Sequence, residues 1–306
     1  MRRVFLVGVA LLGGPSAGSQ DLPVFTSSVE MVRLDVSVTR DGRPVKGLTG
    51  RDFEVRDNGV LQEAEVVGQE ERPVHAVLAL DNSASLGGDR LGRLKVAAHS
   101  LLEVLRPDDA VSLLTFSHRL ELKALPGASR EEVHEAIEAT EAQLTTALYD
   151  ATFAALTMAD PSLGRPVVLV FTDGEDVGSW IRPEQVLRAA STSDLVSHAV
   201  MSGKTVADVS FLEKLATATG GEVWRVEELE VEGAFLAAVE EFRARYTLQY
   251  AVPYDARERW HDIEVRLRVS GVEVRAREGY LNSDRQPDEP RRVPADRTMG
   301  RSHGPN

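Results

Sequence analysis

Residues 74–85 read VHAVLALDNSAS, an apolar run that only His75 interrupts and that ends in oxygen-bearing side chains. An apolar run of this length is typical of a strand in a parallel sheet that is covered on both faces. Similar runs recur at 111–116, 167–171 and 195–200, and segments with apolar residues at helical spacing separate them. This alternation predicts an α/β fold built on a doubly wound, mostly parallel sheet.

The segments on either side of residues 73–246 follow a different pattern. Residues 29–67 and the segment from Thr247 onward alternate apolar and polar side chains with period two, which is typical of half-buried strands. Each flank supplies about three strands, whereas a β-sandwich usually needs about seven. We therefore expect residues 20–72 and 247–283 to pair into one β-sandwich, with the α/β domain of residues 73–246 inserted between them.

The two ends of the chain differ from the domains between them. Residues 1–19 begin with Met-Arg-Arg, continue with an apolar stretch too short to span a bilayer and end in small residues, which predicts a signal peptide. No later stretch is long and apolar enough to predict a transmembrane segment, so we expect the mature protein to be extracytoplasmic, either periplasmic or secreted. Residues 284–306 are rich in proline and charge and show no apolar period, which predicts a disordered tail.

The composition narrows the classes of function. The chain of 306 residues has 48 Asp and Glu against 35 Lys and Arg, a net charge of −13, which argues against a nucleic-acid partner because such binding neutralises many phosphates. It has no cysteine, which excludes disulfides, thiolate nucleophiles and zinc–thiolate sites. Any bound metal must therefore have oxygen or imidazole ligands.

Three oxygen-rich stretches lie where the carboxyl ends of the predicted strands meet, the edge at which open α/β sheets bind ligands. Their candidate ligands are Asp81, Ser83 and Ser85, then Thr145 and Thr146, and finally Asp173. Side chains two residues apart in an extended turn point the same way, so the first three can face one point. Hard oxygen donors from separate loops suit Mg²⁺. If hydroxyls bind the ion directly and the carboxylates act largely through water, the ion keeps enough charge to bind an outside carboxylate.

Each stretch also has other interpretations. Asp81 to Ser85 and Thr146 are suited to N-capping of helices, and Asp173 before Gly174 is suited to a tight turn. An enzyme in which Ser83 is the nucleophile, or in which the metal activates water, is a second class of function, but Ser83 has no histidine nearby in the sequence. A structural envelope protein with a degenerate metal site is a third.

The order of these residues resembles a known family. Asp81-x-Ser83-x-Ser85, the later Thr146 in TALYDA and Asp173 in FTDG are similar to the metal-ion-dependent adhesion site of von Willebrand factor type A domains. The flanking segments, from Gly42 to Val55 and from Val272 to Tyr280, resemble those of a bacterial secreted group within that family.

The resemblance implies a function and a set of ligands. Ser83, Ser85 and Thr146 would hold Mg²⁺, or else Mn²⁺ or Ca²⁺, while Asp81 and Asp173 would ligate the ion or position its waters. The protein would then be a secreted adhesion module, not an enzyme, that captures an Asp or Glu side chain of a protein partner.

One part of the sequence departs from the family pattern. Many relatives have two glycines before the threonine, and here those positions are Leu144 and Thr145. The second of these positions is thus occupied by a β-branched residue, Thr145, whose hydroxyl is an additional candidate donor beside that of Thr146.

Overall fold

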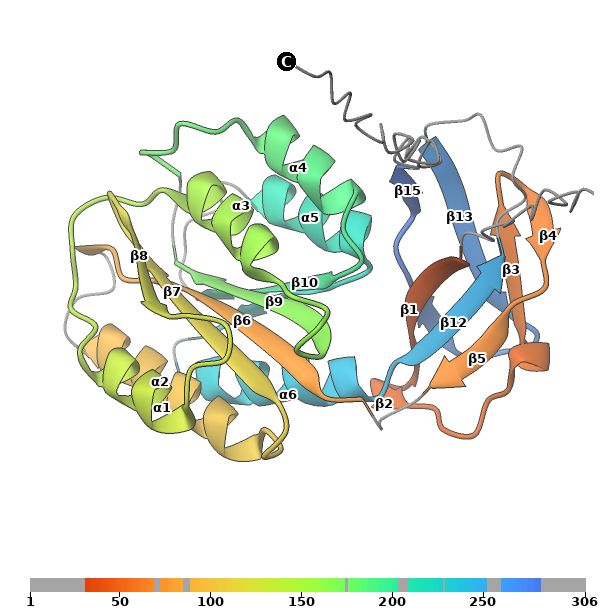
Figure 1. Ribbon diagram of the computed structural model, residues 1–306, viewed down its shortest axis with the longest axis horizontal. Coiled ribbons are helices and arrows are strands. Elements are labelled where there is room, and N and C mark those ends of the chain that lie inside the picture. Colours follow the sequence, from red (N-terminus) through yellow and green to blue (C-terminus); the bar gives the residue numbers. More distant parts are fainter. Residues whose placement is uncertain are drawn as a thin grey trace, which may run out of the picture.

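The computed structural model describes residues 31–68, 72–84, 89–173, 176–202, 209–227, 229–251 and 260–281. The predicted signal peptide, the predicted tail and Ser85 lie outside these residues. Two parts stand side by side in Figure 1: a sheet covered by helices and a smaller pair of sheets. No helix in the described part of the chain combines the length and the apolar character that a membrane span requires.

The larger part is built on a six-stranded sheet in the order β11-β10-β9-β6-β7-β8. All neighbouring strands are parallel except β7 and β8, so the predicted doubly wound, mostly parallel sheet is confirmed. The strands are β6 (Val74–Asp81), β7 (Ala110–Phe116), β8 (Leu120–Ala124), β9 (Arg165–Thr172), β10 (Val196–Ser202) and β11 (Val223–Val226).

Helices cover both faces of this sheet (Figure 1). One face carries α1 (Asp89–Val104), α2 (Arg130–Glu138) and α6 (Val231–Arg243), and the other carries α3 (Leu148–Met158), α4 (Pro183–Ser191) and α5 (Val209–Thr219). Leu78 and Leu80 of β6 belong to the first of the two cores, whereas Val77 and Ala79 belong to the second. Because β6 packs against helices on both sides, its sequence is apolar except for His75 and the final Asp81, instead of alternating.

The smaller part consists of two antiparallel sheets, in the orders β14-β1-β12-β5, with β2 beside β1, and β15-β13-β3-β4. The amino-terminal flank supplies β1 (Met31–Arg40), β2 (Arg43–Pro44), a 3₁₀ turn η1 (Gly50–Asp52), β3 (Phe53–Asp57), β4 (Val60–Gln62) and β5 (Glu65–Gly68). The carboxyl-terminal flank supplies β12 (Tyr246–Ala251), β13 (Trp260–Leu267), β14 (Glu273–Arg275) and β15 (Gly279–Leu281). Both flanks contribute to each sheet, and side chains such as Leu34, Leu248, Phe53 and Ile263 share one core. The predicted β-sandwich built from both flanks is therefore confirmed.

One predicted helix ends earlier than expected. The periodicity of residues 235–246 predicts a helix through Tyr246, but α6 ends at Arg243 and Tyr246 is the first residue of β12. The ring of Tyr246 packs 5.3 Å from that of Phe53, and its hydroxyl donates to the carbonyl of Val45 (2.8 Å). Burial in the sandwich thus takes precedence over helical periodicity.

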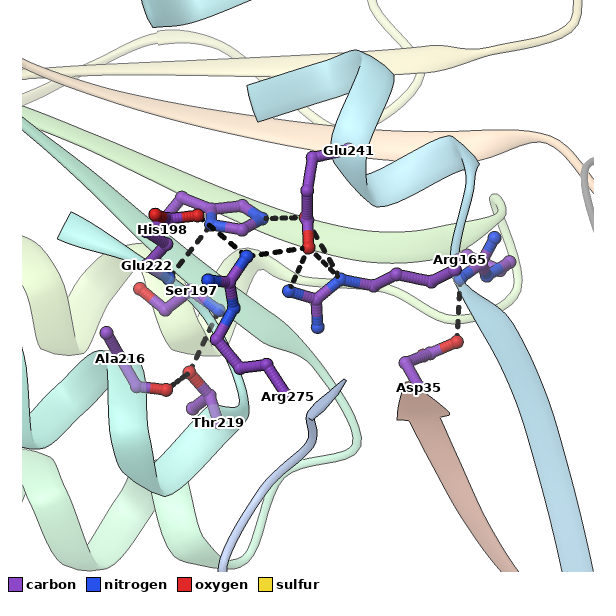
Figure 2. A network of polar contacts seen from close by, with 10 residues as sticks. Asp35, Arg165, Ser197, His198, Ala216, Thr219, Glu222, Glu241 and Arg275 are labelled. Atoms are coloured by element: carbon purple, nitrogen blue, oxygen red, sulfur yellow. Dashed lines mark hydrogen bonds and ion pairs between the residues drawn. The ribbon is translucent and has the colours of Figure 1, made fainter. Parts of the chain in front are cut away.

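A cluster of charges around Glu241 of α6 joins the two parts (Figure 2). The Glu241 carboxylate lies 2.8 Å from Arg245, 3.0 Å from Arg275 of β14 and 3.2 Å from the Nε2 atom of His198 on β10. Burial acts to raise the pKa of Glu241, but the charge of Arg245 and the contact with His198 bring it below its ordinary value. The carboxylate therefore stays ionised and holds the end of α6 against a strand of the sandwich.

A second polar cluster lies inside the sandwich. Asp57, buried at the end of β3, accepts hydrogen bonds from the hydroxyls of Tyr250 (2.8 Å) and Tyr280 (3.1 Å) and contacts Nδ1 of His261 (2.7 Å). Burial raises the pKa of both tyrosines, so their hydroxyls stay protonated and donate. A single carboxylate thus links strands of both sheets.

Replacing this carboxylate should destabilise the fold. We expect Asp57→Ala to lower the free energy of unfolding by about 3 kcal/mol, because it leaves three buried polar groups without their acceptor. Urea unfolding measures this difference. Glu54→Ala, on the same strand, removes a partly exposed carboxylate that pairs with Arg56 and should change the stability little. Equal losses in the two variants would contradict the assignment.

Candidate metal site

Asp81, the last residue of β6, is a buried carboxylate with neutral partners. Its Oδ1 accepts a hydrogen bond from the backbone N–H of Ser83 (2.8 Å), and its Oδ2 accepts one from the hydroxyl of Thr172 (2.7 Å). Within the described residues, no Lys or Arg forms an ion pair with it. Burial raises the pKa of Asp81 to about 6, and the nearby charge of Asp173 contributes to the rise. An ionised carboxylate in this position is costly unless a cation accompanies it.

Asp173 is the second carboxylate of the site and directly follows β9. It is buried, and Nη1 of Arg90 in the first turn of α1 lies 3.5 Å from its Oδ2. The guanidinium side chain is 42% exposed, so water screens this long contact. The contact with Arg90 therefore offsets the negative charge of Asp173 only in part.

Backbone contacts bring the loop before α3 to the loop after β6. The N–H of Ala84 donates to the carbonyl of Leu144 (3.1 Å), and the N–H of Val177 donates to the carbonyl of Thr146 (3.0 Å). Because the Thr146 carbonyl is engaged by another loop, the helix begins only at Leu148, and the expectation that Thr146 opens it is wrong by two residues. Thr146 is therefore not the N-cap of α3.

The two adjacent threonines differ in exposure. Thr146 is buried, whereas Thr145 is exposed, with its hydroxyl close to Gly178. The predicted ligands in the described residues, Asp81, Ser83, Thr146 and Asp173, thus come from three loops at the carboxyl edge of the sheet. Within the described chain, no three His, Cys, Asp or Glu side chains gather as a metal-binding group. The candidate site instead combines two carboxylates with hydroxyls.

Two residues of the site were not predicted from the sequence. Thr172 holds Asp81, which requires that β6 and β9 be neighbours in register, with Leu80 beside Phe171. Arg90 reaches Asp173 from α1, and no spacing in the sequence signals this contact. Thr172 stood inside an oxygen-rich stretch, so its polar role could have been suspected, but its partner could not.

The sequence of residues 76–175 matches the profile of the von Willebrand factor type A domain, a range that includes every candidate ligand. The chain therefore contains a von Willebrand factor type A domain, a kind of domain that typically mediates protein interactions. No curated protein matches the sequence.

Solved structures share this fold at low identity. Proximal thread matrix protein 1 from the mussel byssus is 17% identical with a TM-score of 0.51, and the match covers 60% of this chain and 48% of the mussel protein. A structure of the same protein with a zinc-occupied MIDAS motif is 17% identical with a TM-score of 0.50, over 62% of this chain and 50% of the other. This chain therefore spans about half the length of the mussel protein.

A von Willebrand factor type A protein from Catenulispora acidiphila matches over a longer range. It is 12% identical with a TM-score of 0.50, and the match covers 84% of this chain and 75% of the other. At such identities the likeness shows the fold alone.

The raised pKa of Asp81 predicts two pH effects of opposite sign. Metal binding needs the ionised carboxylate, so Mn²⁺ affinity should fall about tenfold between pH 7 and pH 5. In the metal-free protein the pKa lies above the ordinary value of 3.8, so Asp81 contributes stability that is present below that value and lost as pH rises through about 6. Calorimetric titration and urea unfolding in EDTA measure the two effects, and a flat affinity profile from pH 5 to 7 would contradict the assignment.

The contact between Arg90 and Asp173 predicts that the guanidinium opposes metal binding. Arg90→Gln should raise Mn²⁺ affinity about two- to fivefold, the effect of one partly exposed charge. Arg188→Gln, an exposed arginine of α4, makes the same change in net charge at a different place and serves as the control. An equal increase in both variants would mean that only net charge matters.

Proposed function

We propose that the protein binds a divalent cation, Mg²⁺ in the first instance, and through it captures an Asp or Glu side chain of a protein partner. The ligands would be Asp81, Ser83, Ser85, Thr146 and Asp173, with Ser85 included from the sequence alone. The buried carboxylate of Asp81, which forms no ion pair with a described Lys or Arg and feels the charge of Asp173, is the observation that carries this proposal.

The chemistry of the donors favours an ion that remains open to a further ligand. Mg²⁺ takes about six oxygens and keeps several waters when few carboxylates bind it directly. Here Asp81 is occupied by Ser83 and Thr172 on both of its oxygens, which suits a carboxylate that positions water instead of covering the ion. When bound, the ion would supply positive charge at the surface to which a partner's carboxylate can coordinate.

The mussel byssus structure supports a divalent cation in this kind of fold, since its MIDAS motif is occupied by zinc. That neighbour does not specify Mg²⁺ for this chain. Mg²⁺ is preferred here because the candidate donors are all oxygens and the chain has no cysteine.

A binding role is preferred to a catalytic one because the described histidines are engaged elsewhere. His75 contacts Ser112, His99 contacts His134, His118 contacts Ser117, His198 contacts Glu241 and His261 contacts Asp57. A hydrolase using Ser83 would need a base within hydrogen-bond reach. The pattern of residues 1–19 further leads us to propose that the mature protein acts outside the cytoplasm.

Calorimetric titration with Mg²⁺ and Mn²⁺ tests the ligand set. Asp81→Ala should abolish binding, because it removes the buried carboxylate that the cation would neutralise. Thr146→Ala should weaken binding about tenfold or more, whereas Thr145→Ala, one residue away and exposed, should change it less than about twofold. Wild-type affinity in Asp81→Ala would refute the site, and a larger effect at Thr145 would reassign the hydroxyl donor.

Capture experiments test the partner. The full-length protein should retain a protein from an envelope extract in Mg²⁺ and release it in EDTA, and Asp81→Ala should retain none in either condition. A partner that survives both EDTA and the substitution would contradict metal-mediated capture.

A further inference from the structure

A cavity of about 390 Å³ lies between the two parts of the molecule, at the amino ends of β9 and β10. This is the sheet edge opposite to the one that carries Asp81. The charged residues of its lining are the arginines Arg33, Arg72, Arg165 and Arg277 and the aspartates Asp35 and Asp194. The lining thus has two more positive than negative groups, although the chain as a whole has a net charge of −13.

Arg165, the first residue of β9, is a buried cation with an incomplete set of partners. Its Nη2 donates to Oδ1 of Asp35 on β1 (2.7 Å; Figure 2), and its guanidinium lies 4.6 Å from the ring of Phe242. Its Nε atom is buried and has no hydrogen-bond partner among the described residues. A guanidinium has five N–H donors, so one carboxylate leaves part of it unsatisfied.

Arg277, which precedes β15, is in the same situation. It is 9% exposed, and its Nη1 donates to the carbonyl of Ser193 (3.1 Å) and to Asp194 (3.0 Å). Its Nε atom is also buried, and no group in the described part of the chain accepts a hydrogen bond from it. Buried charged donors without acceptors are costly, and two arginines that carry such a donor lie on the wall of this one cavity.

The remaining two arginines lie at the rim. Arg33 and Arg72 are exposed, and no ion pair with a described carboxylate holds either of them. Arg33 lies two residues from Asp35 on β1, so both side chains point to the same face of the strand. Long cationic side chains in this position can close over an anion held by the buried pair.

We propose that this cavity binds a small dianion through carboxylate or phosphate oxygens. The cavity has the volume of roughly a dozen water molecules, which admits a four-carbon dicarboxylate or a phosphate group but not a folded partner. Arg33 and Arg277 belong to the sandwich and Arg165 belongs to the α/β domain, so the bound anion would bridge the two parts. The site is separate from the candidate metal site and does not depend on it.

Calorimetric titration and thermal unfolding of the whole protein with succinate and with inorganic phosphate test the site, at an ionic strength held constant with chloride. We expect saturable binding and a rise in Tm with at least one dianion, and no comparable effect of acetate. The preferred dianion distinguishes a carboxylate ligand from a phosphate ligand. Equal weak effects of succinate, phosphate and acetate would overturn the proposal.

Substitutions at the rim locate the binding. Arg33→Gln with Arg72→Gln should weaken binding about tenfold or more, the loss expected for one charge-assisted hydrogen bond, without lowering the stability of the free protein. Arg51→Gln with Arg188→Gln alters two exposed arginines outside the cavity and gives the same net charge. Unchanged affinity in the first variant, or equal losses in both, would show that the cavity is not the site.

Discussion

The candidate site depends on one constraint: a carboxylate is buried at the end of β6, and no described Lys or Arg forms an ion pair with it. Asp81 lies between β7 and β9, where its two hydrogen-bond donors, Ser83 and Thr172, orient it without neutralising it. The metal-free fold therefore retains either a proton or an uncompensated charge at this point. A cation bound at the open edge of the sheet would compensate the charge of Asp81. The Asp81 carboxylate therefore destabilises the metal-free site and stabilises the metal-bound one.

The connectivity of the chain decides which edge is open. The chain enters the α/β domain through β6 and leaves it through α6, and both ends adjoin the sandwich (Figure 1). The carboxyl ends of the strands must then point away from the sandwich, and an eight-residue strand such as β9 spans about 25 Å. Arg165 begins β9 at the junction with the sandwich, and Asp173 follows β9 at the other edge. A partner at the metal site and an anion at the junction would therefore not compete for space.

The architecture could be predicted from the sequence because the order of apolar and polar residues reflects which side chains are buried. Apart from His75, the run at 74–80 is apolar because its side chains alternate between two cores, and the period-two flanks have one buried face each. Contacts between residues far apart in the chain leave no comparable pattern in the sequence. The hydrogen bond between Thr172 and Asp81 depends on the order of the strands in the sheet. Tyr246 lies in a strand instead of the predicted helix because its ring packs in the sandwich. The burial of Arg165 could not be predicted either, because an arginine is ordinarily expected at the surface and nothing in the neighbouring sequence indicates otherwise.

Paramagnetic broadening of backbone amide signals by Mn²⁺ tests most directly whether the carboxylates at the sheet edge form a metal site. Broadening falls steeply with distance, so substoichiometric Mn²⁺ should first remove the signals of residues 82–84, 144–147 and 172–173. The amides of the sandwich, at the far end of the strands, should keep their intensity, and Mg²⁺ in excess should restore the lost signals. Broadening that is uniform over the acidic surface, or that centres on residues away from Asp81 and Asp173, would contradict the account.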